Sequence, residues 1–242
     1  TAVASGATLS IAGDSNIGSG SLNLSGGTVT VTGSTGTIDN AVALTNTSTL
    51  TATNDLILSG VISGTGNLIK TGTSILTLGG NNTYSGATTV SAGTLKIAAN
   101  GNLGSGQVNL AAGTTLQVTG ATTIDNSVAM TGDATVQADA AVGISGVVSG
   151  AFNLAKTGSG ALTLSGTDTY SGTTTVSSGS LLVNGSLATS GVTVSSGATL
   201  GGSGTIFASS STNTVTVSSG ATLAPGNSPG KLTINGNLAA SG

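Results

Sequence analysis

Residues 66–97 read GNLIKTGTSILTLGGNNTYSGATTVSAGTLKI, and residues 151–183 read AFNLAKTGSGALTLSGTDTYSGTTTVSSGSLLV. Within them, segments 81–95 and 167–181 are identical at ten of fifteen positions and start 86 residues apart. The same shift aligns the chain without gaps well beyond these segments, so that IDN at 38–40 meets IDN at 124–126. A sustained period of this kind is typical of repeat architectures, in which each unit stacks on a copy of itself.

Short apolar–polar–apolar runs, broken by Gly, Asn or Ser, fill each period. Examples are Leu76-Thr77-Leu78, Leu162-Thr163-Leu164 and Val215-Thr216-Val217. Alternation with a period of two predicts strands that have one buried face. The chain has 41 glycines among 242 residues, and each glycine inside a helix costs about 1 kcal/mol relative to Ala. We therefore expect essentially no helix.

Many short strands fit a sandwich, a barrel or a solenoid, and the gapless period favours the solenoid. The sequence thus predicts an all-β parallel β-helix, or β-solenoid. The 86-residue period divides into four coils of 21–22 residues, which gives about eleven coils in all. No linker or charge run interrupts the chain, so we expect a single domain over 1–242, with repeat units of approximately 1–86, 87–172 and 173–242.

The composition suits such stacking. Charged residues make up only 5% of the chain, with seven Asp, four Lys and a net charge of −3, whereas an average domain has about 25%. Like charges stacked at the strand spacing repel each other, so repeating positions favour Val, Ile and Leu inside and Ser or Thr outside. Four scattered lysines do not neutralise a phosphate track, so we expect no nucleic-acid partner.

Signals for targeting are not visible in this sequence. The N-terminal residues lack the basic and apolar regions of a signal peptide. No stretch reaches the ~18 apolar residues of a membrane helix. We expect any contact with a membrane to run through a segment outside this chain.

Residues 66–97 and 151–183 resemble the autotransporter-associated β-strand repeat of bacterial type V secretion passengers. Residues 197–206 and 215–238, with Leu-Ala-Pro-Gly-Asn-Ser-Pro-Gly at 223–230, resemble a stretch found late in such passengers. The resemblance implies a right-handed parallel β-helix, extracellular or exposed on a bacterial cell surface, with host or cell-surface glycans or proteins as partners. It implies no activity, because a fold alone does not determine function.

Catalytic residue types are scarce. The sequence has no His and no Cys, which removes the usual nucleophile–base pairs and the usual zinc, copper and haem ligands. We expect no enzyme and no cofactor, and a glycan-active enzyme that uses aspartates alone is a less favoured alternative. Asp125, Asp133 and Asp139 are a possible calcium site on neighbouring coils, and solvated turn aspartates are the preferred interpretation.

Four residues at equivalent repeat positions are candidates for ligand contact. Tyr84 and Tyr170, the two tyrosines, offer rings that stack on sugars. The preferred interpretation is structural: each ring covers a corner of a coil while its hydroxyl stays in water. Four coils place them roughly 19 Å apart, too far for one small ligand. Lys70 and Lys156 are either a basic column for anionic glycans or turn lysines whose stems lie on the surface.

Two further alternatives remain open. Threonine arrays such as Thr28–Thr32 and Thr173–Thr175 raise ice binding, although we expect their phase not to be kept from coil to coil. Unpaired strand edges at the ends of a solenoid raise a self-assembling filament, stacked end to end or laterally. The sequence favours a non-enzymatic extracellular rod with a structural or adhesive role.

Overall fold

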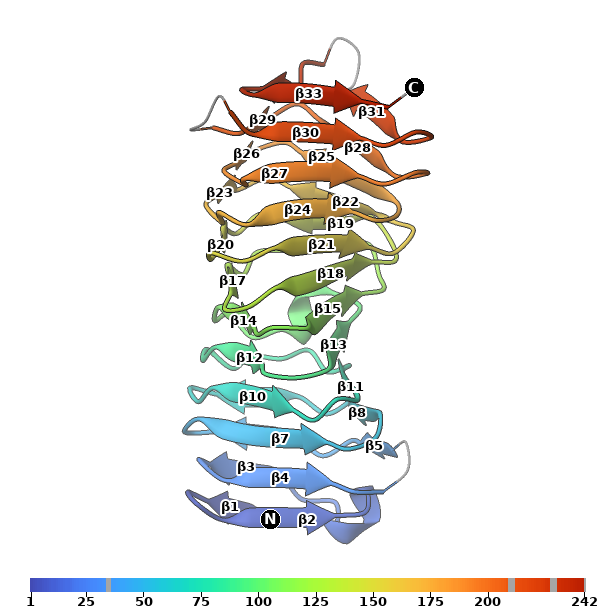
Figure 1. Ribbon diagram of the computed structural model, residues 1–242. Helices are drawn as coiled ribbons and strands as arrows, with labels where there is room; N and C mark the ends of the chain where they lie inside the picture. Colours follow the sequence, from blue (N-terminus) through green and yellow to red (C-terminus); the bar gives the residue numbers. More distant parts are fainter. Residues whose placement is uncertain (34–35, 209–211, 227–229, 242) are drawn as a thin grey trace. The chain divides into compact units, whose positions relative to one another are not determined.

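The computed structural model describes residues 1–33, 36–208, 212–226 and 230–241 and confirms an all-β fold (Figure 1). The chain divides into two compact units, Thr1–Leu116 (unit 1) and Gln117–Gly242 (unit 2). Within the described ranges the helical elements are two short 3₁₀ turns, η1 (Asp14–Asn16) and η2 (Asn100–Asn102). None of the described helices is long and apolar enough to cross a membrane. Residues 227–229 of the Leu-Ala-Pro-Gly-Asn-Ser-Pro-Gly motif lie outside the described residues.

Unit 1 consists of parallel sheets whose strands come from successive coils. In the order in which they pair, the strands are β1 (Ala2–Ala4), β3 (Leu22–Ser25), β6 (Val42–Leu44) and β9 (Ile62–Gly64) in one sheet; β2 (Thr8–Ile11), β4 (Thr28–Val31), β7 (Ser48–Ala52), β10 (Leu68–Thr71), β12 (Thr88–Val90) and β14 (Val108–Leu110) in the second; and β5 (Gly36–Ile38), β8 (Leu56–Leu58), β11 (Ile75–Leu78) and β13 (Thr94–Ile97) in the third. Strand β15 (Thr114–Val118) contains the division between the units.

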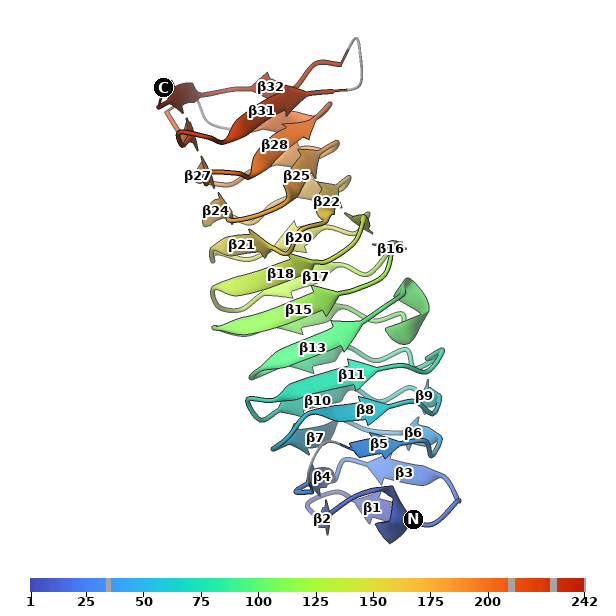
Figure 2. The same ribbon diagram turned by 90° about the vertical axis from the view of Figure 1, so that its right-hand side faces the viewer.

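Unit 2 repeats this plan, and Figure 2 shows the strands of one of its sheets side by side. That sheet contains β16 (Thr122–Ile124), β19 (Val142–Ile144), β22 (Ala161–Leu164), β25 (Ser180–Val183), β28 (Thr199–Gly202) and β31 (Thr222–Pro225). A second sheet contains β18 (Ala134–Ala138), β21 (Leu154–Thr157), β24 (Thr173–Val176), β27 (Gly191–Val194), β30 (Thr214–Val217) and β33 (Asn237–Ala240). The third side carries β17 (Val128–Met130) paired with β20 (Val148–Ser149), then β23 (Thr167–Asp168), β26 (Ser186–Leu187), β29 (Thr205–Ile206) and β32 (Thr233–Ile234).

The length of a coil differs from the prediction. Leu68 pairs with Ser48 in the coil before it and with Thr88 in the coil after it, and Leu154 pairs with Ala134 and Thr174. Each of these steps is 20 residues, not 21–22, so 242 residues correspond to about 12 coils rather than eleven. An 86-residue repeat is then four coils plus six residues, about one side of a coil. The prediction of four whole coils per repeat is wrong, because a chain that advances as a screw need not return to the same side.

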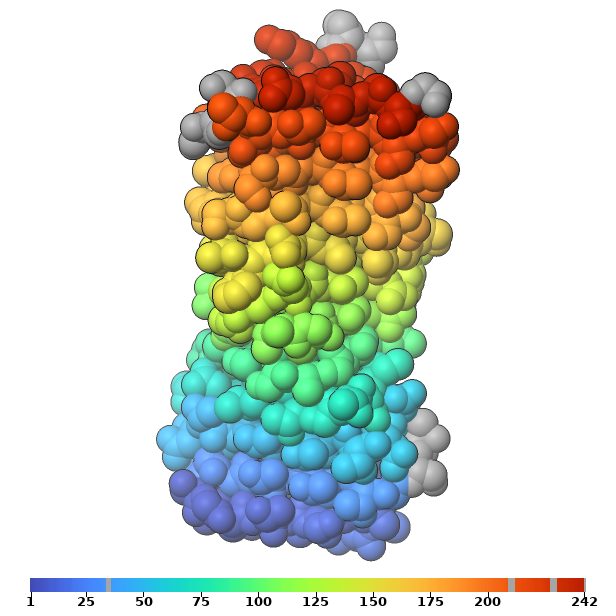
Figure 3. Space-filling model, viewed as in Figure 1, coloured from blue at the N-terminus to red at the C-terminus, as the bar shows by residue number. Residues whose placement is uncertain are grey.

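The core of each unit is a set of inward-facing columns. In unit 1 one column runs through Val29, Leu50, Lys70, Val90 and Leu110, each paired with its neighbour in the adjacent coil. All five are at most 2% exposed. The space-filling view shows that side chains close the spaces between successive ribbons (Figure 3). The apolar–polar alternation in the sequence therefore predicts the inward face correctly at the apolar members of this column, whereas Lys70 takes an inward position that alternation does not predict.

Glycine is required where adjacent coils turn a corner in contact. Gly72 and Gly158 occupy equivalent positions after a strand and have φ of +78° and +80°. A Cβ at Gly72 would lie 2.1 Å from the Ala52 carbonyl oxygen, and one at Gly158 would lie 2.3 Å from that of Ala138. Both the positive φ and the lack of space exclude other residues.

Candidate functional site

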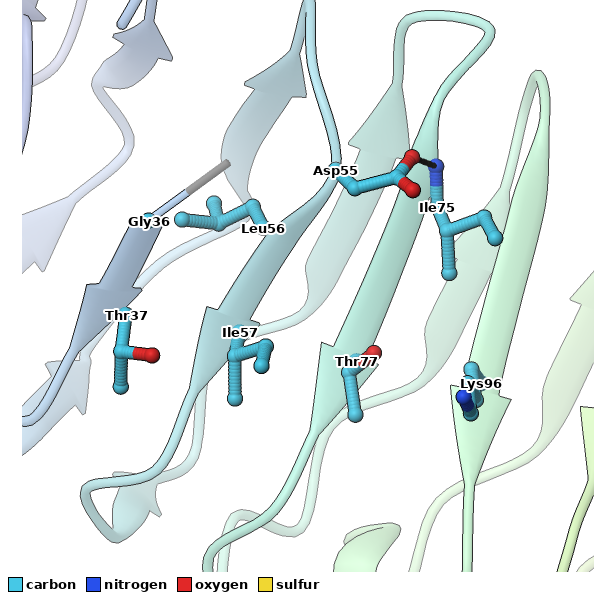
Figure 4. Close-up of a pocket in the computed structure, with 8 residues that line it drawn as sticks. All are labelled: Gly36, Thr37, Asp55, Leu56, Ile57, Ile75, Thr77 and Lys96. Atoms are coloured by element: carbon cyan, nitrogen blue, oxygen red, sulfur yellow. Dashed lines mark hydrogen bonds between the residues drawn. The ribbon is translucent and has the colours of Figure 1, made fainter. Parts of the chain in front are cut away.

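The outer face of unit 1 has a shallow trough of about 240 Å³ across four parallel strands, β5, β8, β11 and β13 (Figure 4). Four outward side chains, one from each strand, form a row along it. The register pairs Thr37 with Ile57, Ile57 with Thr77 and Thr77 with Lys96. The parallel pairing of successive coils thus brings together four residues from a 60-residue stretch of sequence.

The centre of the trough is apolar and its edges are hydroxylic. Ile57 is 42% exposed, and Ile75 is half-buried next to it. Thr37 and Thr77 flank Ile57 on the two adjacent strands. A single exposed apolar side chain is ordinary on a protein surface, so Ile57 distinguishes this trough only together with the charged groups beside it.

The two charges of the trough are not equivalent. The Asp55 carboxylate accepts a hydrogen bond from the Ile75 N–H at 2.9 Å. Its negative charge also counteracts the fall in the pKa of the buried Lys70. Lys96, by contrast, forms no ion pair with any carboxylate in the part of the chain that the structure describes. The trough therefore holds one ammonium and one carboxylate, and the ammonium has no ion-pair partner within the described residues.

Unit 2 contains the repeat-equivalent trough, of about 360 Å³, across β16, β19 and β22. Its row pairs Thr123 with Gly143, then Thr163, then Leu182 of β25. The two threonines stand at the positions of Thr37 and Thr77. The functional residues are replaced: Asp55 by Ala141, Ile57 by Gly143, Ile75 by Ala161 and Lys96 by Leu182. The strand frame is duplicated, whereas the apolar centre and both charges are found in unit 1.

The two tyrosines are core residues. Both rings have no exposed surface, so neither forms the open platform that stacking on a sugar needs. Each hydroxyl lies 2.6 Å from a threonine Oγ1, that of Thr88 for Tyr84 and that of Thr174 for Tyr170. The expectation of a hydroxyl in water is wrong, because the threonine four residues later supplies the bond inside the coil. Burial raises the pKa of both phenols.

The two lysines are buried as well, contrary to both sequence interpretations. Lys70 takes an inward-facing position in its strand, and its Nζ donates to the carbonyl oxygens of Thr71, Gly72 and Ala92 at 3.4, 2.8 and 2.8 Å. Lys156 repeats this arrangement with Thr157, Gly158 and Ser178 at 2.8, 2.9 and 2.9 Å. Burial lowers the pKa of each ammonium to about 8. Each ammonium donates hydrogen bonds to carbonyl oxygens of two consecutive coils at a corner. Neither lysine therefore contributes to a basic column on the surface.

The three aspartates proposed as a calcium site each serve a different neighbour. Asp125 accepts from the Ser145 hydroxyl at 3.0 Å, and Asp133 accepts from the backbone and side-chain N–H groups of Asn153 at 2.9 Å. Asp139 accepts from Gln117 at 2.7 Å and from Gln137 at 3.0 and 3.2 Å. Among the described residues, no three acidic side chains form a metal-binding group. These carboxylates act as links between coils.

The Thr-x-Thr phase is not kept from coil to coil, as the sequence predicts: in the second sheet of unit 1 it is complete on β4 and β7, whereas β2 has Ser10 and β10 has Ile69. The second sheet presents two outward columns in register: Thr8, Thr28, Thr49, Ile69 and Thr89 in one, and Ser10, Thr30, Thr51 and Thr71 in the other. The Thr51 and Thr71 hydroxyls lie 2.8 Å apart and bond to each other. Unequal coil lengths of 20 and 21 residues hide this register in the sequence. The Thr51–Thr71 bond links two coils, and the two columns carry no charge.

Sequence reasoning singled out none of Asp55, Ile57 or Lys96. Their signal is nevertheless present in the 86-residue alignment, as three positions at which the copies differ in charge or size. What the alignment alone does not give is the 20-residue register that places them in one trough.

Comparisons with known proteins agree with the resemblance seen in the sequence. The family described as passenger-associated-transport-repeat matches residues 68–97 and 154–183. A relative named adhesin BmaC autotransporter, from Brucella suis biovar 1 (strain 1330), is 40% identical over 107 residues. The match covers 43% of this chain and 3% of the relative, so the chain spans a small part of that protein. No solved structure matches the chain.

Proposed function

We propose that this chain, which carries two passenger-associated-transport repeats, is an adhesive segment of a bacterial protein that is secreted or exposed at the cell surface. It has no catalytic role: its solenoid presents a binding surface. The observation that carries the proposal is the unit 1 trough, which combines an apolar centre with the Lys96 ammonium and the Asp55 carboxylate. The matching relative is named an adhesin and an autotransporter, which supports the same class of protein.

The chemistry of the trough favours an acidic saccharide. Ile57 and Ile75 suit the apolar face of a sugar ring, and Thr37 and Thr77 offer hydroxyls on either side. The carboxylate of Asp55 accepts hydrogen bonds from sugar hydroxyls. Lys96 pairs with a uronate or sulfate group, a charge-assisted contact stronger than a neutral hydrogen bond. A volume of about 240 Å³ is below the range of deep ligand sites, so we expect one ring of a longer chain to bind here.

The proposal is tested with an array of uronate-bearing, sulfated and neutral saccharides, with binding measured on the purified 242-residue chain. We expect acidic saccharides to bind and K96L to weaken their binding about two- to fivefold, as loss of one partly exposed ion contact predicts. K231L is the matched control, because it removes the same charge from outside the trough and leaves binding unchanged.

Two outcomes contradict the proposal: no acidic saccharide binds, or K96L and K231L weaken binding equally. The second outcome indicates an attraction that depends on net charge alone. The filament alternative gives a different result, namely assembly that depends on protein concentration and needs no saccharide. Sedimentation velocity in the same buffer separates the two.

A further inference from the structure

A buried carboxylate in unit 2 lacks a partner for one of its oxygens. Asp168 lies on β23, next to the repeat's tyrosine, and is 2% exposed. Its Oδ1 accepts a hydrogen bond from the Val148 N–H of the preceding coil at 2.7 Å. Its Oδ2 is buried and has no hydrogen-bond partner among the described residues. A buried polar atom of this kind is costly, and more so when it carries charge.

The first repeat has an amide side chain, Asn82, at the position equivalent to Asp168. Asn82, which is 86 residues earlier, accepts from the Ile62 N–H at 2.8 Å and donates through Nδ2 to the Asn102 carbonyl oxygen. The amide thus bonds to the coil before it and to the coil after it. An ionised carboxylate has the same shape but only acceptors. Asp168 therefore reproduces one half of the Asn82 bridge and leaves the other half unmade.

Protonation removes the charge of this buried carboxylate and gives it a hydrogen-bond donor. The protonated acid has an O–H donor and no charge, so it is close to an amide in its bonding. We propose that Asp168 is an acid-responsive lock, which holds its coil of unit 2 more tightly in mildly acidic than in neutral surroundings. This inference is independent of the saccharide trough, which lies in unit 1.

The groups packed against Asp168 do not titrate between pH 5 and pH 8. Strands β20 and β26, which pack on either side of β23, contain Val148, Ser149, Ser186 and Leu187, none of which is ionisable. The titratable neighbour is Tyr170, whose pKa is raised by burial and by the Asp168 charge, so it stays neutral at pH 5–8. Burial raises the pKa of Asp168 to about 6 against an ordinary 3.8, while the Val148 hydrogen bond opposes the rise.

The sign of the effect follows from linkage. Because the folded-state pKa is above the unfolded one, the folded state binds the proton more tightly, and stability increases as the pH falls through 6. With these two values the equilibrium for opening the coil falls about tenfold between pH 7.5 and pH 5. Hydrogen bonds from Asn153 lower the pKa of Asp133, so its own transition lies below this window.

Hydrogen exchange of the full chain at pH 5 and pH 7.5, corrected for intrinsic rates, measures the opening. We expect protection of the Val148 amide to be about tenfold higher at pH 5 in the wild-type protein. In D168N protection should be independent of pH and at least as high as the wild-type value at pH 7.5. The proposal is overturned if the wild-type protein shows no increase, or if D168N keeps it.

The reverse substitution in the first repeat should introduce the same pH dependence of amide exchange there. N82D should give the Ile62 amide the pH dependence that Val148 loses in D168N, while exchange in unit 2 stays as in the wild type. An Ile62 amide without pH dependence in folded N82D contradicts the lock. If N82D does not fold, the comparison of D168N with the wild type decides the matter.

Discussion

The two copies of the repeat share the buried contacts of their lysines and tyrosines and differ at outward positions of their troughs. Lys70 and Lys156 each donate to three carbonyls at equivalent corners, and Tyr84 and Tyr170 each bond to the threonine four residues later. The outward positions of the two troughs, in contrast, keep their threonines and change everything between them. Buried positions are set by the coil, and a change there affects stability. Outward positions are free of that demand, so the residues that differ are where a specific function is to be sought.

The largest stability effect is expected at the buried lysines. K70M and K156M keep the length of the side chain but leave three partly buried carbonyls without their donor, and each should lower the free energy of unfolding by about 2–3 kcal/mol. Urea unfolding followed by circular dichroism measures the loss. Because the two lysines make equivalent contacts, K70M and K156M should lower the free energy of unfolding by equal amounts.

K96M is the control for these variants, because it makes the same replacement at a partly exposed site. It should change the free energy of unfolding by no more than about 0.5 kcal/mol. A K70M protein as stable as K96M contradicts the role of the ammonium as a fastener between coils.

A smaller effect should distinguish the two tyrosines. In Y84F the Thr88 hydroxyl loses the hydrogen-bond partner that the structure gives it, which we expect to cost about 1–2 kcal/mol. In Y170F the Thr174 hydroxyl keeps a bond to the Thr189 hydroxyl at 3.0 Å, so the cost should be about half as large. The same urea experiment tests this, and a Y170F loss equal to or above that of Y84F contradicts the assignment.

Much of the fold is predictable from the sequence for a simple physical reason. Alternation such as Leu76-Thr77-Leu78 directly encodes the inner and outer faces of a strand, and the 86-residue period encodes stacking. The coil length could not be read from the period. The period of 86 residues is not a whole number of 20-residue coils, because the repeat ends on a different side of the coil from the one on which it begins. An error of one or two residues per coil accumulates and moves residues to another side.

The roles of the polar residues were harder to predict. Lys70 stands in a column with Leu50 and Val90, and a charged residue at an inward position is uncommon unless its charge is satisfied. The carbonyls that satisfy it come from corners 1, 2 and 22 residues away, a grouping that propensity does not reveal. The trough was missed for a related reason, because its four residues meet only when the register is known.

Four residues of the unit 1 trough, Asp55, Ile57, Ile75 and Lys96, stand on a strand frame that both units share and create the proposed binding site. The most direct measurement moves them. Binding of an acidic saccharide is compared in the wild type, in a variant with D55A and K96L, and in that variant with A141D, G143I, A161I and L182K added. We predict that binding is lost in the second protein and returns in the third. The proposal is contradicted if the variant with D55A and K96L still binds, or if adding A141D, G143I, A161I and L182K does not restore binding.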